Sequence, residues 1–122
     1  MDSRVKSLAL VLVLVLTLVT VTTAHMAFSK SEPEADSVLL ESPHHIQIWF
    51  TQDPDPVVSQ VRLDGPRGDV VLGELMVHDD KSVMRMVPSS LSKGEYKVSW
   101  RSAGEDGHIQ RGEFEFTVRA GN

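Results

Sequence analysis

Short runs in which apolar and polar residues alternate recur through most of the chain. In the run 46–50 every second residue, starting with Ile46, is apolar, so these side chains would share one face of a strand. In the run 83–87 the sequence does not decide which face is buried, because valines occupy one face and methionines the other. The expected strands are 25–29, 46–50, 57–63, 70–72, 75–77, 83–87, 95–100 and 114–118.

Turn-forming residues separate these runs at intervals of about 8 to 12 residues. Residues 53–56 read Asp-Pro-Asp-Pro and residues 64–68 read Asp-Gly-Pro-Arg-Gly, and both are typical of turns. We expect a further turn at 32–37, which contains Pro33. No stretch after residue 24 keeps the apolar period of an amphipathic helix over three turns. The pattern therefore predicts a single all-β domain, a Greek-key sandwich of about seven strands.

The beginning of the chain has the organisation of an export signal. Arg4 and Lys6 precede an almost uninterrupted apolar run, 8–21, and small residues follow it at the expected cleavage point. The apolar run is shorter than the roughly 20 residues that a membrane-spanning helix needs. We therefore expect residues 1–24 to be a cleaved signal peptide. Residues 25–122 would form a mature domain without a membrane anchor, in the periplasm or secreted.

Composition narrows the possible chemistry. The chain has no cysteine, so a metal site would need nitrogen, oxygen or thioether ligands, and disulfides and thiolate nucleophiles are excluded. Removing Asp2, Arg4 and Lys6 from the totals of 12 basic and 17 acidic residues leaves 10 and 16, a net charge of −6. This balance argues against nucleic acid or an anionic membrane as a partner and favours cations. Because nucleophile elbows, phosphate-binding loops and His-Glu-x-x-His motifs are also missing, no enzyme is predicted.

One short motif brings metal-binding side chains together. Asp106 and His108 are two residues apart, so in an extended segment both would point to one side, with Gly107 leaving the space between them open. Cleavage after Ala24 would make His25 the first residue, and its amine and ring Nδ1 can bind one ion together. Three nitrogens and one oxygen suit a tetragonal Cu(II) site. The same residues also fit an ordinary chain end and a solvated turn.

The remaining histidines and methionines are weaker candidates. His44 and His45 are adjacent, so they would face opposite sides of a strand, and His78 would lie in a surface turn beside two aspartates. Thioethers bind Cu(I), but methionine more often fills gaps in a hydrophobic core. The sequence leaves open whether Cu(I) binding involves any of Met26, Met76, Met84 and Met86.

Several segments together are similar to a known family. They are the N-terminal histidine of the mature chain followed by 31–33, then 93–101, 106–108, Gly112 and 114–118. These residues resemble the CopC family of copper-resistance proteins, over essentially all of 25–122. The resemblance implies an immunoglobulin-like β-sandwich or barrel of seven strands. It also implies an exported protein that binds Cu(II) and carries copper, often beside the membrane protein CopD.

The Cu(II) ligands of the family carry over to this chain residue by residue. They would be His25, through its amine and imidazole, with Asp106 and His108, and they would hold one Cu(II) ion per chain. Some members also bind Cu(I) in a loop with Met and His, but residues 51–70 contain neither, so a Cu(I) site is not expected. The resemblance further implies a CopD-like inner-membrane partner. Two alternatives remain open: an exported adhesion or interaction domain without a metal, and an oxidative copper enzyme, which the carboxylate ligand disfavours.

Overall fold

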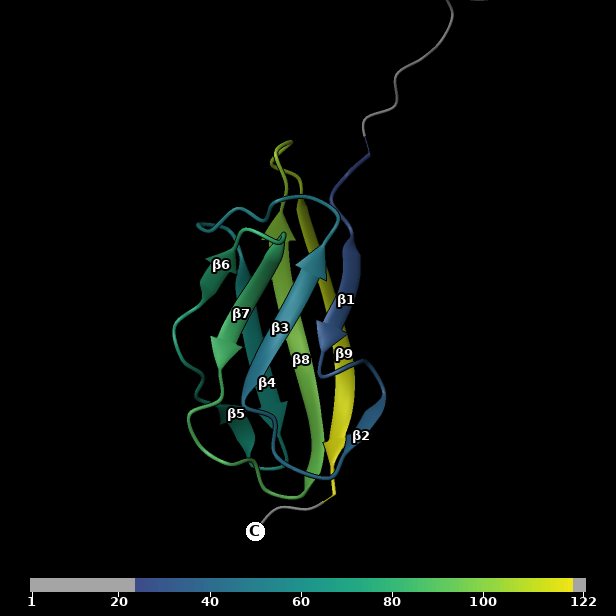
Figure 1. The fold of residues 1–122 in the computed structure, drawn as a ribbon, viewed down its shortest axis with the longest axis vertical. Helices are drawn as coiled ribbons and strands as arrows, with labels where there is room; N and C mark the ends of the chain where they lie inside the picture. The colour runs from purple at the N-terminus through teal and green to yellow at the C-terminus, as the bar shows by residue number, and fades with distance from the viewer. Residues whose placement is uncertain (1–23, 120–122) are drawn as a thin grey trace, which may run out of the picture.

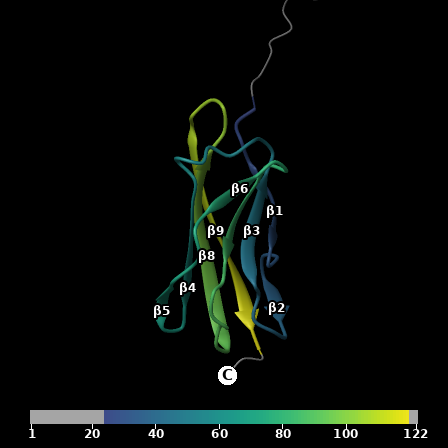
Figure 2. The ribbon, with the colours of Figure 1, turned by 60° about the vertical axis from the view of Figure 1, so that its left-hand side comes forward.

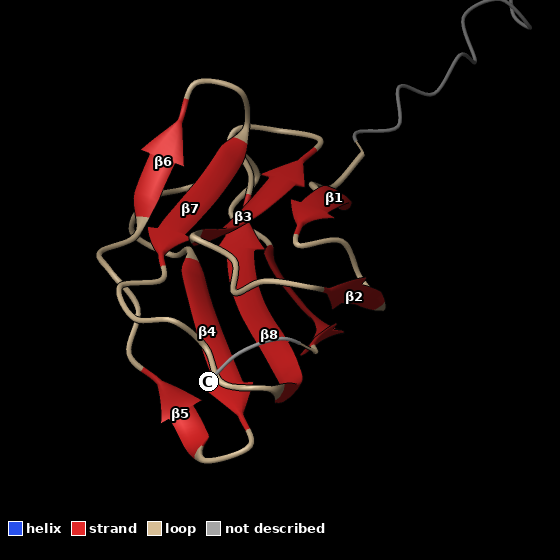
Figure 3. Ribbon diagram, turned by 60° about the horizontal axis from the view of Figure 1, so that its bottom comes forward, coloured by secondary structure: helices blue, strands red, loops and turns tan. Residues whose placement is uncertain are grey.

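The computed structural model describes residues 24–119 as two β-sheets packed face to face (Figure 1, Figure 2). Strands, turns and loops make up this range, which contains no α-helix (Figure 3). Apart from Ala24, the expected signal peptide lies outside the described residues. The nine strands are β1 (Phe28–Glu32), β2 (Ser37–Leu39), β3 (His45–Phe50), β4 (Gln60–Gly65), β5 (Gly68–Val70), β6 (Met76–His78), β7 (Ser82–Met86), β8 (Gly94–Ala103) and β9 (Ile109–Val118).

The strands form a four-stranded sheet in the order β1-β3-β7-β6 and a five-stranded sheet in the order β2-β9-β8-β4-β5. The all-β sandwich predicted from the alternation is therefore confirmed. Among the described residues no helix is long and apolar enough to cross a membrane.

One strand that the sequence did not predict is β2, which pairs in parallel with β9. The turn expected at 32–37 is shorter than predicted, because Glu32 still belongs to β1 and Ser37 already begins β2. Asp36 makes this tight connection with a φ of 61°, in the left-handed region that aspartate tolerates better than most residues. Ser37, Val38 and Leu39 are half-buried or exposed, so this strand has no alternating buried face that the sequence could reveal.

Alternate residues of the facing strands fill the space between the sheets. Ile46, Ile48 and Phe50 of β3 are buried, as the alternation predicts. From the other sheet, the rings of Tyr96 and Phe116 stack with centroids 5.5 Å apart. Burial of each large apolar side chain contributes about 1.5–3 kcal/mol, so this layer is the main source of stability.

The structure also decides which face of β7 is buried. Val83 is 1% exposed and Met86 is 44% exposed, so the valine face points inward. Arg85 lies on that inward face and donates hydrogen bonds to the carbonyl oxygens of Gly73 at 2.6 Å and Val61 at 2.7 Å. Because these backbone acceptors compensate the guanidinium for lost hydration, the charge is tolerated at the edge of the core.

Two segments that are far apart in the sequence meet at one end of the sandwich. The long strands β8 and β9 pair from Gly94 opposite Val118 to Ala103 opposite Ile109, and residues 104–108 connect them. Figure 1 shows that the chain enters β1 at the same end, at the top of the picture.

Candidate metal centre

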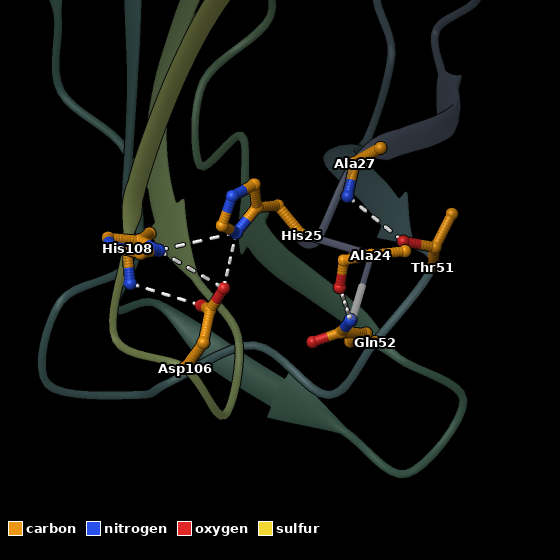
Figure 4. Close-up of polar contacts among 7 residues, drawn as sticks. All are labelled: Ala24, His25, Ala27, Thr51, Gln52, Asp106 and His108. Atoms are coloured by element: carbon orange, nitrogen blue, oxygen red, sulfur yellow. Dashed lines mark hydrogen bonds and ion pairs between the residues drawn. The ribbon is translucent and has the colours of Figure 1, made fainter. Parts of the chain in front are cut away.

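The backbone on both sides of His25 is tied to the residues that follow β3 (Figure 4). The side-chain amide of Gln52 donates a hydrogen bond of 2.8 Å to the carbonyl oxygen of Ala24. Ala27 and Thr51 share two hydrogen bonds of 2.9 Å, one between their backbones and one from the Ala27 N–H to Thr51 Oγ1. The imidazole of His25 nevertheless projects outward, with 57% of the side chain exposed.

Met26 holds the same segment from the inside. Its side chain is 2% exposed and belongs to the hydrophobic core. Gly104, the first residue of the β8–β9 loop, packs directly against this anchor. A Cβ atom at position 104 would overlap Oε1 of Gln52 and lie 3.1 Å from the Cβ of Met26, closer than ordinary van der Waals contact. The close packing fixes the position of the N-terminal segment relative to the loop.

The β8–β9 loop presents Asp106 and His108 through a tight turn. The Gly107 N–H donates to the carbonyl oxygen of Gly104 at 3.1 Å, and the φ of Gly107 is 74°, which glycine adopts without steric cost. The backbone N–H of His108 donates to Asp106 Oδ1 at 3.1 Å, as in an Asx turn. The expectation of an extended segment is therefore wrong. The turn nevertheless brings the two side chains to one side, toward His25 (Figure 4).

The structure places the three residues singled out in the sequence around one point. Asp106 Oδ2 lies 2.5 Å from Nδ1 of His25 and 3.3 Å from Nδ1 of His108. The two Nδ1 atoms are 3.3 Å apart, and the imidazole rings meet edge to face. One donor atom from each residue lies within 4.8 Å of the other two. These are positions that a single metal ion could bridge.

Asp106 supplies negative charge to this cluster. The hydrogen bond with His25 lowers the pKa of the Asp106 carboxyl, and the backbone N–H of His108 lowers this pKa further. The carboxyl group is therefore ionised at neutral pH and attracts cations. The side chains of His25, Asp106 and His108 are 57%, 32% and 68% exposed, so an ion could enter or leave without a conformational opening.

The donor atoms fit a divalent transition metal. Two imidazoles and one carboxylate are ligands for Cu(II), Ni(II) and Zn(II), and copper has the highest affinity in this series. While Ala24 is attached, the His25 nitrogen is a peptide amide. Removal of Ala24 would convert this nitrogen into an amine, which can form a chelate ring with Nδ1 of the same residue. Glu105 is exposed and is not part of the cluster.

The other histidines do not converge with further ligands. His45 lies in β3 and contacts Glu32 at 3.2 Å, while His44 precedes the strand and is exposed. His78 is exposed at the end of β6. Within residues 24–119, the group at positions 25, 106 and 108 is the one set of three or more His, Asp or Glu side chains whose donor atoms lie this close together.

The methionines have different environments. Met26 is buried, which fits core packing, whereas Met76 and Met86 are 39% and 44% exposed. The register places Met76 opposite Met84 and Met86 opposite His45, on the outer side of the four-stranded sheet. Met26 therefore fills space in the hydrophobic core, whereas the exposed methionines Met76 and Met86 do not.

The contacts of Gln52 and Thr51 were not found from the sequence, since neither residue belongs to a metal-binding motif. Their role arises from the pairing of β1 with β3, which places the end of β3 beside the N-terminal segment. Both residues directly follow the alternating run 46–50, and this position is the one feature of the sequence that could have indicated their role.

Comparison with known proteins adds independent information. A family model described as the CopC domain matches residues 28–119. Copper resistance protein C of Escherichia coli is 30% identical over 105 residues, which cover 79% of this chain and 82% of that protein. The crystal structure of PcoC, a methionine-rich copper resistance protein from Escherichia coli, matches with a TM-score of 0.70 and 29% identity over 79% of this chain and 100% of that chain. CopC from Methylosinus trichosporium OB3b matches with a TM-score of 0.70 and 28% identity over 78% of this chain and 94% of that chain.

Proposed function

The chain belongs to the CopC domain family, and we propose that it is an exported copper carrier that holds one Cu(II) ion between His25, Asp106 and His108. The names of its relatives support copper as the metal, since two of them are described as copper resistance proteins. The proposal describes a binding protein, because the three side chains offer metal ligands and the family is one of copper-resistance proteins.

The observation that carries the proposal is the convergence of the three donors. His25 precedes β1, whereas Asp106 and His108 belong to the loop between β8 and β9, yet their donor atoms lie within 4.8 Å of one another. Here the N-terminal segment, the Asx turn and the core packing of Met26 together hold the geometry.

Signal-peptide cleavage would complete the ligand set. We propose that residues 1–24 direct export and are removed, which leaves His25 with a free amine. The amine must lose a proton before it can bind a metal, and its reference pKa is near 8. Copper affinity should therefore rise with pH through neutrality. The same cleavage frees the side chain of Gln52 from the Ala24 carbonyl oxygen and leaves it beside the new amine.

Release of copper would use the open side of the centre. Because all three side chains are partly exposed, ligands of a partner could replace them one at a time. A membrane protein of the CopD type is the partner that the family suggests, and the periplasm or cell exterior is the compartment. The carboxylate favours Cu(II) over Cu(I), so reduction would also promote release.

A Cu(II) titration of two chains tests the proposal. One chain begins at His25 and the other retains Ala24, which moves the free amine from residue 25 to residue 24. We expect tight 1:1 binding and a nitrogen-rich tetragonal electron paramagnetic resonance spectrum for the chain that begins at His25. Retention of Ala24 should weaken binding by more than the roughly 10- to 100-fold that the loss of an outer-shell partner costs.

Two substitutions in the chain that begins at His25 provide the matched comparison. His108→Ala should weaken Cu(II) binding by more than tenfold, because it removes a ligand. His45→Ala should leave the affinity unchanged, because His45 contacts Glu32 on β1 and lies outside the cluster. Equal, weak binding by all of these chains would refute the copper proposal.

A further inference from the structure

The outer face of the five-stranded sheet carries a hollow that is lined by arginines. Its volume is about 430 Å³, and Arg62 of β4, Arg101 of β8 and Arg111 of β9 border it. Residues 25–122 contain 10 basic and 16 acidic residues, so a group of three arginines is a local reversal of the overall charge. Such a reversal indicates an anionic ligand.

The strand register explains the shape of the hollow. Arg101 lies between Gln60 and Arg111 in one row across the sheet, and Ser99 lies opposite Arg62 in the next row. The small side chain of Ser99 leaves space between the longer ones. From strand spacings of about 4.8 Å and residue spacings of about 3.3 Å, the Cβ atoms of Arg62 and Arg111 are roughly 12 Å apart. This width suits several carboxylates along a chain better than one small anion.

The guanidinium groups are available to a ligand. Arg62 approaches Asp69 at 3.8 Å, but both side chains are more than 60% exposed, so this ion pair is weak. The Nε of Arg101 donates to the carbonyl oxygen of Val58 at 3.1 Å, which orients the group and leaves its terminal nitrogens for other acceptors. Within residues 24–119 no carboxylate lies within ion-pair distance of Arg111.

The surrounding charges favour a narrow ligand over a flat one. Glu113 lies opposite Ser99 in the same row as Arg62 and borders the hollow, so the lining has one carboxylate beside its three arginines, and its ion pair with Lys97 at 3.9 Å is exposed. The next row toward the far end of the sheet contains Asp64, Lys97 and Glu115. A flat anionic membrane would meet these carboxylates together with the arginines. An extended peptide could contact the arginines and avoid the acidic row.

The hollow also lies near the metal centre. Arg101 and Arg111 are opposite each other, two residues before the strand ends at Ala103 and Ile109, which border the β8–β9 loop. Two residues of strand correspond to about 7 Å. We propose that the hollow docks a carboxylate-rich peptide segment of the protein that exchanges copper with this chain. The identity of this partner rests on the proposed copper function, whereas docking of an acidic segment does not.

The test uses hexaglutamate as the probe and the metal-free chain that begins at His25. In two-dimensional amide NMR spectra, we expect hexaglutamate to shift the signals of Arg62, Ser99, Arg101 and Arg111, with affinity that falls as salt is added. Arg111→Gln should weaken binding about fivefold, the value of one exposed ion pair of about 1 kcal/mol. Arg67→Gln removes the same charge in the β4–β5 turn at the far end of β4 and should change nothing.

Three results would overturn the proposal. The first is shifts that are absent or spread over all basic residues. The second is equal binding of free glutamate at the same carboxylate concentration, which would indicate a site for small anions. The third is co-sedimentation with phosphatidylglycerol vesicles that Arg111→Gln abolishes, which would indicate a membrane surface. A Cu(II) titration of the same variant separates the two proposals, because Arg111→Gln should not alter copper affinity.

Discussion

Replacement of Met26 by alanine tests whether the hydrophobic core positions the candidate metal ligand His25. Met26 is 2% exposed and directly follows His25, while Ala27 is held to Thr51 by two hydrogen bonds. Without the methionine side chain, residues 25 and 26 would have no apolar anchor in a chain that begins at His25. We expect them to leave the surface for part of the time, with β1 still in place.

The size of the effect follows from the burial of this side chain. Met→Ala substitutions in closed cores cost about 2–5 kcal/mol. Met26 lies at a chain end that can detach locally, so the lower value of about 2 kcal/mol applies. Apparent affinity decreases in proportion to the docked fraction, and 1.4 kcal/mol is a factor of ten. The Cu(II) dissociation constant should therefore increase by up to about 30-fold.

Urea denaturation and a Cu(II) competition titration measure the two quantities, in chains that begin at His25. Met26→Leu is the conservative control and should retain affinity within about threefold, because it conserves volume. Val118→Ala is the control for stability. Val118 is fully buried opposite Gly94, at the end of the β8–β9 pair away from the loop, so its loss should cost about 2 kcal/mol without changing copper affinity.

One outcome would refute the reasoning. If Met26→Ala destabilised the protein as much as Val118→Ala and left the copper affinity unchanged, the core would not position His25. The two ligands in the β8–β9 loop and the flexible terminus would then be sufficient for binding.

Three further predictions concern local contacts. Gly104→Ala should weaken Cu(II) binding, because the new Cβ would lie 3.1 Å from the Cβ of Met26 and would push the segment that carries His25 away from the loop, and a titration that shows no change would contradict this. In the metal-free protein the pKa of Asp106 should lie below its ordinary value of about 3.9, and His25→Ala should raise it, as measured by carboxyl NMR. Because this pKa is lowered by folding, the contribution of Asp106 to stability is present above the ordinary value and is lost as pH falls through the lowered one. Ser82→Ala should raise the pKa of Asp80, since the Ser82 hydroxyl donates a hydrogen bond of 2.5 Å to that carboxylate, and an unchanged NMR midpoint would contradict the assignment.

The alternation of apolar residues predicted the central strands correctly but misplaced others, since only Phe28 and Ser29 of the expected strand 25–29 lie in β1 and only Val70 of 70–72 lies in β5. β3 has the predicted pattern at 46–50, and the predicted runs 95–100 and 114–118 lie within β8 and β9. Both long strands extend further, to Ala103 and from Ile109, because backbone pairing continues beyond the last large core residue. The alternation of apolar residues indicates which side chains are buried but not which backbone groups form hydrogen bonds. The sequence therefore could not predict where β8 ends and β9 begins.

The candidate site was predictable only in part, for a similar reason. Asp106 and His108 are close in sequence, and His25 is marked by the expected cleavage point, so their side chains could be proposed without a structure. The supports of the site, Met26 and Gln52, depend on the packing of β1 beside β3. A local pattern carries no information about such contacts.

The positions of His25, Asp106 and His108 imply that a bound metal ion would also affect the stability of the fold. His25 leads into β1 of the four-stranded sheet, and Asp106 and His108 join β8 to β9 of the five-stranded sheet. A bound ion would therefore link the two sheets, in a chain that has no cysteine to form a disulfide. Because the unfolded chain does not hold these residues together, free Cu(II) at 100 times its dissociation constant should stabilise the fold by about 2.7 kcal/mol. The proposed copper centre would then also close the sandwich at the end where the segment that precedes β1 is attached.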